Sequence, residues 1–175
     1  MSGSEAPTLA VRPLSADAFR PFGRVIEAPG REHDASGPGW RWWAETVTLP
    51  TDGRPFGVGY LALEPDRLRF DWAERHMRTV EVIAPLGGDC LVYVGPPENL
   101  DEPARLPELH RFQVFRVPAG MGVAMDPGVW HGAPLAHGAP TSAMVLILEG
   151  TGAHDVTVVR FEDRPVSIEP GDEGS

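Results

Sequence analysis

Short segments that alternate apolar and polar residues run along the whole chain, separated by glycines and prolines. The 175 residues include 20 Gly and 19 Pro, so few uninterrupted segments are longer than a short strand. Many short strands joined by Gly/Pro turns are typical of a β-sandwich or β-barrel. The pattern therefore predicts an all-β fold, with strands at residues 9–14, 24–28, 40–49, 57–64, 67–76, 80–85, 90–94, 112–117, 141–148 and 155–161.

One short helix is predicted near the N-terminus, in the segment SADAFRPFG. Ser15 is a favourable N-cap residue, and Gly23 follows the end of the segment. Neither an internal repeat nor an interdomain linker is visible, which predicts a single barrel domain over residues 1–165. Residues 166–175 end in EPGDEGS and are expected to form a disordered tail.

One predicted strand carries polar residues on the face that should be buried. The even positions of this strand are Leu68, Phe70, Trp72, Glu74 and His76. Alternation predicts that they face the barrel interior, and a buried carboxylate is costly unless it is paired or bound to metal. Glu74 and His76 therefore indicate either a site or a structural pair. Glu81 is an odd number of residues further on, so a tight turn or bulge must bring it inside.

The spacing of Glu74, His76 and Glu81 resembles the first sequence motif of the cupin superfamily, with Glu74 at the position of its first histidine. The segment DPGVWHGAP resembles the second motif, with Asp126 in place of the usual proline and His131 at the histidine position. In cupins the two motifs lie on neighbouring strands and hold one metal. The resemblance implies an antiparallel cupin-like barrel that binds divalent Ni, Mn, Fe or Zn through His76, Glu81 and His131. Glu74 or Asp126 would complete the shell.

Composition and charge narrow the classes of partner. The formal net charge of −10 argues against nucleic acid and anionic membrane surfaces, which require a basic footprint. All 15 basic residues are arginine, so a lysine Schiff base is excluded. The single Cys90 cannot form an internal disulfide and is expected to be a buried structural thiol. With no secretory signal in MSGSEAPTLAVRP and no membrane-length apolar run, we expect a cytoplasmic protein.

Longer segments resemble the ureidoglycolate lyase family of allantoin breakdown over residues 11–161. The resemblance is carried by LSADAFRPFGRVIE, WAERHMRTVEVIAPLGGDCLVYV and GMGVAMDPGVWHGAPLA. Arg41 matches an arginine in that family's R-Y-H-D segment. Glu81 replaces a usual glutamine, and Trp43 and Asp126 replace frequent histidines. The acid at Glu81 restores the cupin-type ligand.

The family resemblance implies a homodimeric lyase that splits ureidoglycolate into glyoxylate and urea. This reaction is the collapse of a carbinolamide and needs a base, an acid and a cation. The resemblance assigns the substrate carboxylate to Arg41, the proton transfers to Glu74 or Asp126, and the hydroxyl to the metal. Two alternatives remain open. One is a divergent cupin lyase, isomerase or cyclase acting on another small hydroxy or keto acid in a biosynthetic pathway. The other is a non-catalytic cupin that binds a small ligand.

Overall fold

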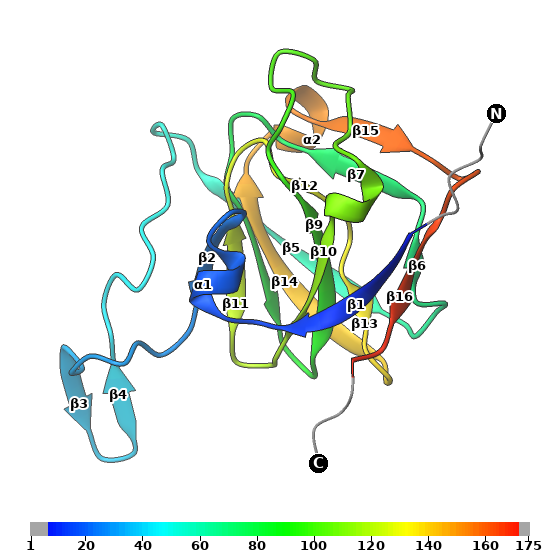
Figure 1. Cartoon of the computed structure of the whole chain (residues 1–175). Helices are drawn as coiled ribbons and strands as arrows, with labels where there is room; N and C mark the ends of the chain where they lie inside the picture. Colours follow the sequence, from blue (N-terminus) through cyan, green and yellow to red (C-terminus); the bar gives the residue numbers. More distant parts are fainter. Residues whose placement is uncertain (1–6, 172–175) are drawn as a thin grey trace.

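Two curved β-sheets face each other across an apolar interior in the computed structural model, which describes residues 7–171 (Figure 1). This arrangement confirms the predicted all-β, cupin-like barrel. Most neighbouring strands are antiparallel, as predicted. The exception is the first strand, β1 (Thr8–Pro13), which is parallel to both of its neighbours.

The larger sheet has nine strands and curls around one side of the molecule (Figure 1). One of its strands, β13, pairs with β9 beside the main order. The strands, from one edge to the other, are β15 (Thr157–Arg160), β7 (Trp72–Arg75), β12 (Trp130–His131), β9 (Cys90–Gly95), β10 (Gln113–Val117), β1, β16 (Val166–Glu169) and β6 (Arg69–Phe70), with β13 (Leu135–Ala136) on β9.

The smaller sheet has five strands, all antiparallel to their neighbours. In order they are β2 (Gly23–Ile26), β11 (Gly122–Met125), β8 (Glu81–Pro85), β14 (Thr141–Leu148) and β5 (Phe56–Leu63). Strand β5 forms one edge of this sheet, and β15 forms an edge of the larger one. Residues of both edge strands line one cavity.

The predicted N-terminal helix is present as α1 (Ala16–Phe19), one turn long. Ser15 is its N-cap, and the Ser15 hydroxyl accepts a hydrogen bond from the Ala18 amide at 3.2 Å. Gly23 already belongs to β2. Two other short helical turns occur among residues 7–171, a 3₁₀ helix (Leu109–Arg111) and α2 (Thr151–His154).

The barrel interior is filled by apolar side chains from both sheets. Val92 and Val94 of β9 meet Ile83 of β8 and Val123 of β11 in one buried cluster. Burying side chains of this kind contributes roughly 1.5–3 kcal/mol each. The odd positions of β9, including Tyr93, pack instead into a second cluster on the other face of the larger sheet. Burial on both faces explains why this strand reads as a continuous apolar run.

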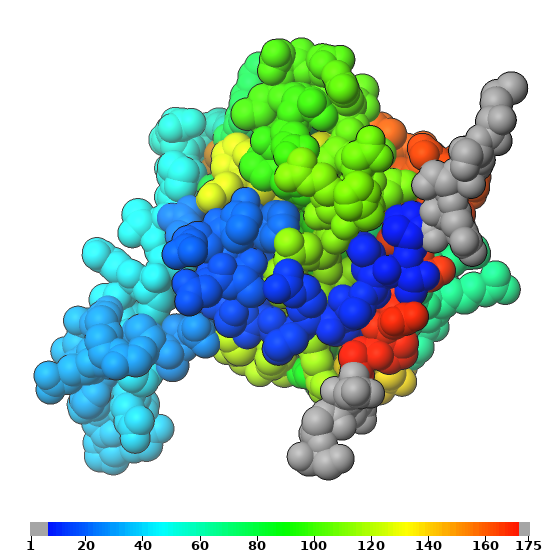
Figure 2. All heavy atoms as spheres, viewed as in Figure 1, coloured from blue at the N-terminus to red at the C-terminus, as the bar shows by residue number. Residues whose placement is uncertain are grey.

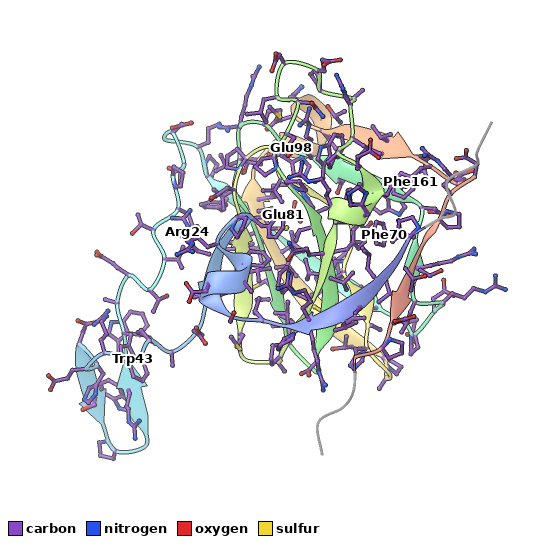
Figure 3. The ribbon with its side chains drawn as sticks, viewed as in Figure 1. Arg24, Trp43, Phe70, Glu81, Glu98 and Phe161 are labelled. Carbon is purple, nitrogen blue, oxygen red and sulfur yellow. The ribbon has the colours of Figure 1, made fainter. Side chains whose placement is uncertain are left out.

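The alternation predicted across residues 67–76 breaks at Asp71, where β6 ends and β7 begins. Phe70 therefore does not share the face of Glu74, and its predicted inward orientation was wrong. It stacks on Tyr93 with the ring centroids 4.0 Å apart, in the second cluster. Figure 3 shows Phe70 and Phe161 together on the side of this cluster, away from Glu81 in the barrel.

A small hairpin stands apart from the barrel (Figures 1 and 2). Within the described part of the chain, its strands β3 (Ala35–Gly37) and β4 (Trp40–Trp42) pair only with each other. The strand predicted at residues 40–49 thus ends at Trp42. The chain beyond it has no ladder partner, and Val47 and Leu49 instead pack on the outer face of the smaller sheet.

The C-terminal boundary differs from the one expected. Residues 166–169 do not begin a tail, because they form β16, which pairs with β1 and β6. Val166 and Ile168 alternate into the second apolar cluster and hold this strand in place. Residues 1–6 and 172–175, where the leader and tail predictions fall, lie outside the described residues. No helix in the described part of the chain is long and apolar enough to cross a membrane.

Candidate active site

A cavity of about 490 Å³ opens between the edge strands β5 and β15. Its polar lining consists of Glu74, His76 and Glu81. The rest of the lining is apolar or glycine and comes from β5, β14, β15 and two loops. These residues are Gly59, Tyr60, Leu61, Ala133, Pro134, Val145, Ile147, Gly152, Val156 and Val158. The cavity is thus an apolar cleft with a few convergent polar groups, as is typical of small-molecule sites.

Strand pairing in the larger sheet brings Glu74 and His131 together. Glu74 of β7 lies directly opposite His131 of β12, so both side chains project from the same face. His131 also pairs with Val94 of β9, an interior residue. These pairings direct Glu74 and His131 into the barrel, an orientation that the alternation predicted for Glu74.

Glu81 enters the site from the opposite sheet. The chain leaves β7 at Arg75, turns through residues 76–80 and begins β8 with Glu81 in the smaller sheet. Glu81 pairs with Met125 of β11, which belongs to the interior cluster. The odd separation from Glu74 is therefore resolved by a crossing between sheets, and not by a bulge within one strand.

The polar atoms of the four residues converge. The His76 Nε2 atom lies 3.1 Å from Glu81 Oε2, and the His131 Nε2 atom lies 3.3 Å from the same oxygen. Ligand atoms of Glu74, His76 and His131 all lie within 4.8 Å of one another. His76, Glu81 and His131 are buried, whereas Glu74 is partly exposed to the cavity.

Backbone contacts fix the tautomer of both histidines. The Nδ1 atom of His76 lies 2.7 Å from the Asp155 carbonyl oxygen, and Nδ1 of His131 lies 3.0 Å from the Val129 carbonyl oxygen. A carbonyl oxygen can only accept, so each Nδ1 carries a proton and donates it. The Nε2 atoms then face Glu81 and, in neutral imidazoles, offer lone pairs, which is the arrangement of metal-binding histidines.

The charges of Glu81 and the histidines depend on one another. Burial alone would raise the pKa of Glu81, but His131 and His76 outweigh it and lower that pKa to about 2. Burial alone would lower the pKa of His131, and the facing Glu81 outweighs it and raises that pKa above its usual range. Without a metal, the centre is thus an ionised Glu81 carboxylate that favours the protonated form of the facing His131.

Asp155 holds the turn that carries His76. Its side-chain oxygens accept hydrogen bonds from the Met77 amide at 2.9 Å and from the Arg78 amide at 2.8 Å. Together with the His76 contact to its carbonyl, this makes Asp155 the anchor of the β7–β8 turn. Sequence reasoning missed Asp155, because it lies far along the chain in no motif and only the fold brings it near.

Arg75, between two site residues, points to the opposite face of β7 and is fully buried. Its guanidinium donates to backbone carbonyls in the loop that follows β9, at 2.8–3.0 Å. These carbonyls belong to Glu98, Asn99, Glu102 and Pro103. The guanidinium carbon also lies 4.5 Å from the centre of the Trp130 ring, next to His131. Arg75 therefore connects β7, which carries Glu74, to β12, which carries His131, on the face of the larger sheet opposite the site.

Two predicted site residues are not brought to the cavity within this chain. Arg41 lies on the exposed hairpin strand β4. Asp126 is half-exposed and forms a 3.3 Å ion pair with Arg24. Figure 3 shows Trp43 next to the hairpin, far from Glu81, and Arg24 on β2 of the barrel.

The single thiol is structural, as expected. Cys90 is fully buried on β9, and burial together with the nearby Asp89 raises its pKa to about 12. A thiol with so high a pKa is not a nucleophile near neutral pH.

The fold and the site define a class of protein: a cupin-type barrel with two histidines and two carboxylates that converge in its interior, beside a cavity that three of them line. Within this class, the chain belongs to the ureidoglycolate lyase family, whose model, described as ureidoglycolate lyase, matches residues 6–169.

Individual relatives agree with this assignment. A ureidoglycolate lyase of Azotobacter vinelandii is 31% identical over 134 residues, covering 73% of this chain and 77% of the relative. One from Pseudomonas syringae pv. tomato is 32% identical and covers 71% and 73%. Ureidoglycolate lyase 2 of Rhizobium meliloti is 29% identical and covers 92% and 97%. A solved dTDP sugar isomerase of Desulfovibrio desulfuricans aligns with a TM-score of 0.41, 18% identity and coverage of 87% and 88%, a likeness too distant to inform the fold.

Proposed function

We propose that this protein is a lyase that cleaves ureidoglycolate into glyoxylate and urea. The observation that carries the proposal is the convergence of Glu74, His76, Glu81 and His131, of which the first three line one cavity and His131 contacts Glu81 behind them. The family and its relatives bear the name of this activity. The reaction breaks the C–N bond of a carbinolamide, so it needs a group that takes the hydroxyl proton and returns a proton to nitrogen.

A divalent metal, Ni, Mn, Fe or Zn, is part of the proposal, and the donor set fits one. Imidazole nitrogens and carboxylate oxygens suit these ions. Such ligands lie about 2.0–2.2 Å from the ion and therefore roughly 3–3.5 Å from one another. The separations of 3.1 and 3.3 Å between each Nε2 and Glu81 Oε2 match this spacing. When bound by His76, Glu81 and His131, the ion would polarise the hydroxyl of the substrate and lower its pKa.

We assign the proton transfers to Glu74. The pKa of about 2 keeps Glu81 ionised near neutral pH, so it is a poor proton carrier. Glu74 is less buried and lines the cavity, where its carboxylate can reach a bound substrate. Glu74 accepts the hydroxyl proton as the O–H electron pair forms the carbonyl of glyoxylate. The C–N electron pair passes to nitrogen, which takes the proton from Glu74 and leaves as urea.

The test of the reaction is glyoxylate release from racemic ureidoglycolate, corrected for the spontaneous rate. Glu74→Gln should lower kcat by about 10²–10⁴-fold, because the amide cannot carry the proton. Glu64→Gln, at an exposed position, is the matched control and should behave like the wild type. A fully active Glu74→Gln enzyme would remove Glu74 from the mechanism. No release by the wild type with added Ni or Mn would refute the substrate.

Metal content tests the ligand assignment separately from turnover. Elemental analysis of protein purified without chelators should find about one ion per chain. His76→Ala and Glu81→Ala should lose it, and Glu74→Gln should retain it. An Ala variant at His76 with full metal content would contradict the assignment.

The cavity walls favour a second candidate function. Tyr60, Val145, Ile147 and Val158 present largely apolar surface, whereas ureidoglycolate is polar along its whole length and would leave amide groups unpaired there. A divergent lyase, isomerase or cyclase acting on a small hydroxy or keto acid with an apolar substituent fits these walls better. The ratio of kcat/KM between such acids and ureidoglycolate decides between the two. A non-catalytic binding protein would turn over neither.

We also propose that the enzyme acts as a homodimer in the reducing cytosol on a small carboxylate substrate. The buried free thiol Cys90 supports the reducing setting. The net charge of −10 supports a small-molecule partner over nucleic acid or a membrane surface.

A further inference from the structure

The cavity of one chain offers no guanidinium to an anionic substrate. Among the described residues, its lining includes Glu74 and Glu81 but no arginine. Carboxylate substrates are usually held by bidentate arginine, which also offsets nearby negative charge. The substrate site is therefore incomplete within residues 7–171 of a single chain.

The hairpin formed by β3 and β4 has one apolar face and one basic face. Gly37 pairs with Trp40 and Ala35 pairs with Trp42, so these residues share a face. Ser36 and Arg41 pair on the other face. Within the described part of the chain, the Arg41 side chain has neither a hydrogen-bond nor an ion-pair partner.

Among residues 7–171, no barrel strand pairs with this hairpin. Trp40 and Trp42 are 52% and 59% exposed, and the hairpin forms a lobe beside the barrel (Figure 2). An isolated two-stranded hairpin is marginally stable in water and needs a packing surface. Two exposed tryptophans on so short a strand are also unusual for a monomer surface and indicate an interface.

The barrel carries an apolar strip that matches the hairpin, at the mouth of the cavity. Val58 and Tyr60 on the edge strand β5 are 69% and 70% exposed. Across the opening, Val156 and Val158 at β15 are also exposed. Tyr60, Val156 and Val158 line the cavity, so the strip and the site are continuous. An unprotected edge strand such as β5 is a ready surface for association.

We propose that the hairpin of each chain docks into the cavity mouth of a second copy and supplies Arg41 to the partner's site. The tryptophan face packs on Val58 and Tyr60 of β5, and the opposite face turns Arg41 across the opening toward β7, Glu74 and the substrate carboxylate. The exchange is reciprocal, because a two-fold dimer uses the same pair of surfaces twice. The charges are complementary, a guanidinium meeting an acidic cavity. The role of Arg41 rests on the proposed function, but the docking does not.

The oligomeric state tests the docking without any activity measurement. Light scattering coupled to size-exclusion chromatography should show a dimer for the wild type and a monomer for Trp42→Ala or Tyr60→Ala. Both side chains are exposed in one chain, so circular dichroism and thermal unfolding should show intact folds. A monomeric wild type, or variants that remain dimeric with unchanged dissociation constants, would overturn the proposal.

Complementation between two impaired variants, assayed at a substrate concentration below the wild-type KM, tests the role of Arg41. Arg41→Ala and His76→Ala are co-expressed with different tags, and the mixed dimer is isolated through both tags. A mixed dimer has one intact site if Arg41 acts across the interface, so it should recover about half of the wild-type activity. If Arg41 acts within its own chain, no site is intact and no activity returns, which overturns the assignment.

Arg78, within the β7–β8 turn, is the rival cation within the same chain. Arg41→Ala should raise KM at least tenfold with the dimer intact, and Arg78→Ala should leave KM near the wild-type value. The reverse result would transfer the role to Arg78. If the wild type releases no glyoxylate, the proposed function fails, and the oligomeric state of Trp42→Ala still decides the docking.

Discussion

At the scale of single residues, Glu81 determines the charge of the centre. It is the only one of the four converging side chains that comes from the smaller sheet, and both imidazole Nε2 atoms face its Oε2 atom. With a metal bound, neutral histidines are required; without one, the imidazolium form of His131 is favoured. Removing the metal should therefore change how the stability of the protein depends on pH.

We expect metal-free protein to be most stable between about pH 4.5 and 6.5. The pKa of Glu81 is depressed from 4.5 to about 2, so its contribution is present above pH 4.5 and disappears as the pH falls toward 2. The pKa of His131 is raised from 6.5, so its contribution is complete below pH 6.5 and disappears as the pH rises through the raised value. Urea unfolding with a chelator across this range measures both effects.

The matched variant for this prediction is Glu81→Gln, which removes the carboxylate and keeps its shape. Its metal-free stability should vary less with pH on both sides of the maximum. A wild-type protein whose metal-free stability stays constant from about pH 6 to 9 would contradict the coupling between Glu81 and His131.

Alternation pointed to Glu74 and His76, and the resemblance to the two cupin motifs added Glu81 and His131, the four residues that converge in the candidate site. Residue spacing carries this information because alternation and motif turns determine which strand ends meet. Asp126 was predicted from its position before the motif turn, but its neighbour Arg24 holds it outside the cavity. Asp155 was not predictable, because its role depends on a backbone carbonyl brought close by tertiary structure.

At the scale of elements, the turn between β7 and β8 is the part of the fold on which the site most depends. It carries His76 on one side and leads directly into Glu81 on the other. The Gly128 amide donates to the His76 carbonyl at 2.7 Å, which ties this turn to the one before His131. Both histidine-bearing segments are thereby held in a fixed relation.

Asp155→Ala should loosen this turn and weaken metal binding by about 10–100-fold, the usual effect of losing a group that orients a ligand. Two backbone amides, of Met77 and Arg78, would lose their acceptor. Competition with a fluorescent chelator measures the affinity. Asp155→Asn keeps one acceptor oxygen and should recover part of it. If the alanine variant binds metal as tightly as the wild type, Asp155 does not position His76.

Arg75→Lys should destabilise the protein by about 2–4 kcal/mol, although it conserves the charge. An ammonium group cannot reach the four carbonyls that the guanidinium contacts or stack on Trp130. Chemical denaturation measures the loss, with Arg67→Lys as the exposed control on the same segment. Equal unfolding free energies for Arg75→Lys and wild type would show that the network is not stabilising.

Most strands were predictable from periodicity, and the exceptions have a physical cause. Strands β11, β12 and β13 are short and lie among glycines and prolines, so they are too brief for alternation to show. Residues 43–49 have the apolar pattern of a strand but find no ladder partner. The sequence pattern therefore could not show that the strand predicted at residues 40–49 ends at Trp42. Where that strand ends depends on tertiary packing, which alternation does not report.

At the scale of the whole molecule, the centre joins the two sheets of the barrel. His131 and Glu74 belong to the larger sheet and Glu81 begins β8 in the smaller one. A metal held by residues of both sheets would resist their separation, which is the event that exposes the interior cluster. Metal binding and global unfolding should therefore be coupled.

Saturating metal should raise the Tm of chelator-treated protein by about 5–10 °C. A ligand present at 100 times its Kd stabilises the native state by about 2.7 kcal/mol, and each kcal/mol shifts Tm by about 2–4 °C in a chain of this size. The measurement is a thermal melt over a series of Ni or Mn concentrations, with Tm rising continuously as the metal concentration increases. His76→Ala removes a ligand from the turn after β7 of the larger sheet, and Glu81→Ala removes one from β8 of the smaller sheet, so each variant should melt at the same temperature with and without metal. A metal-dependent Tm that survives in either variant would mean that the ion binds elsewhere and does not join the sheets.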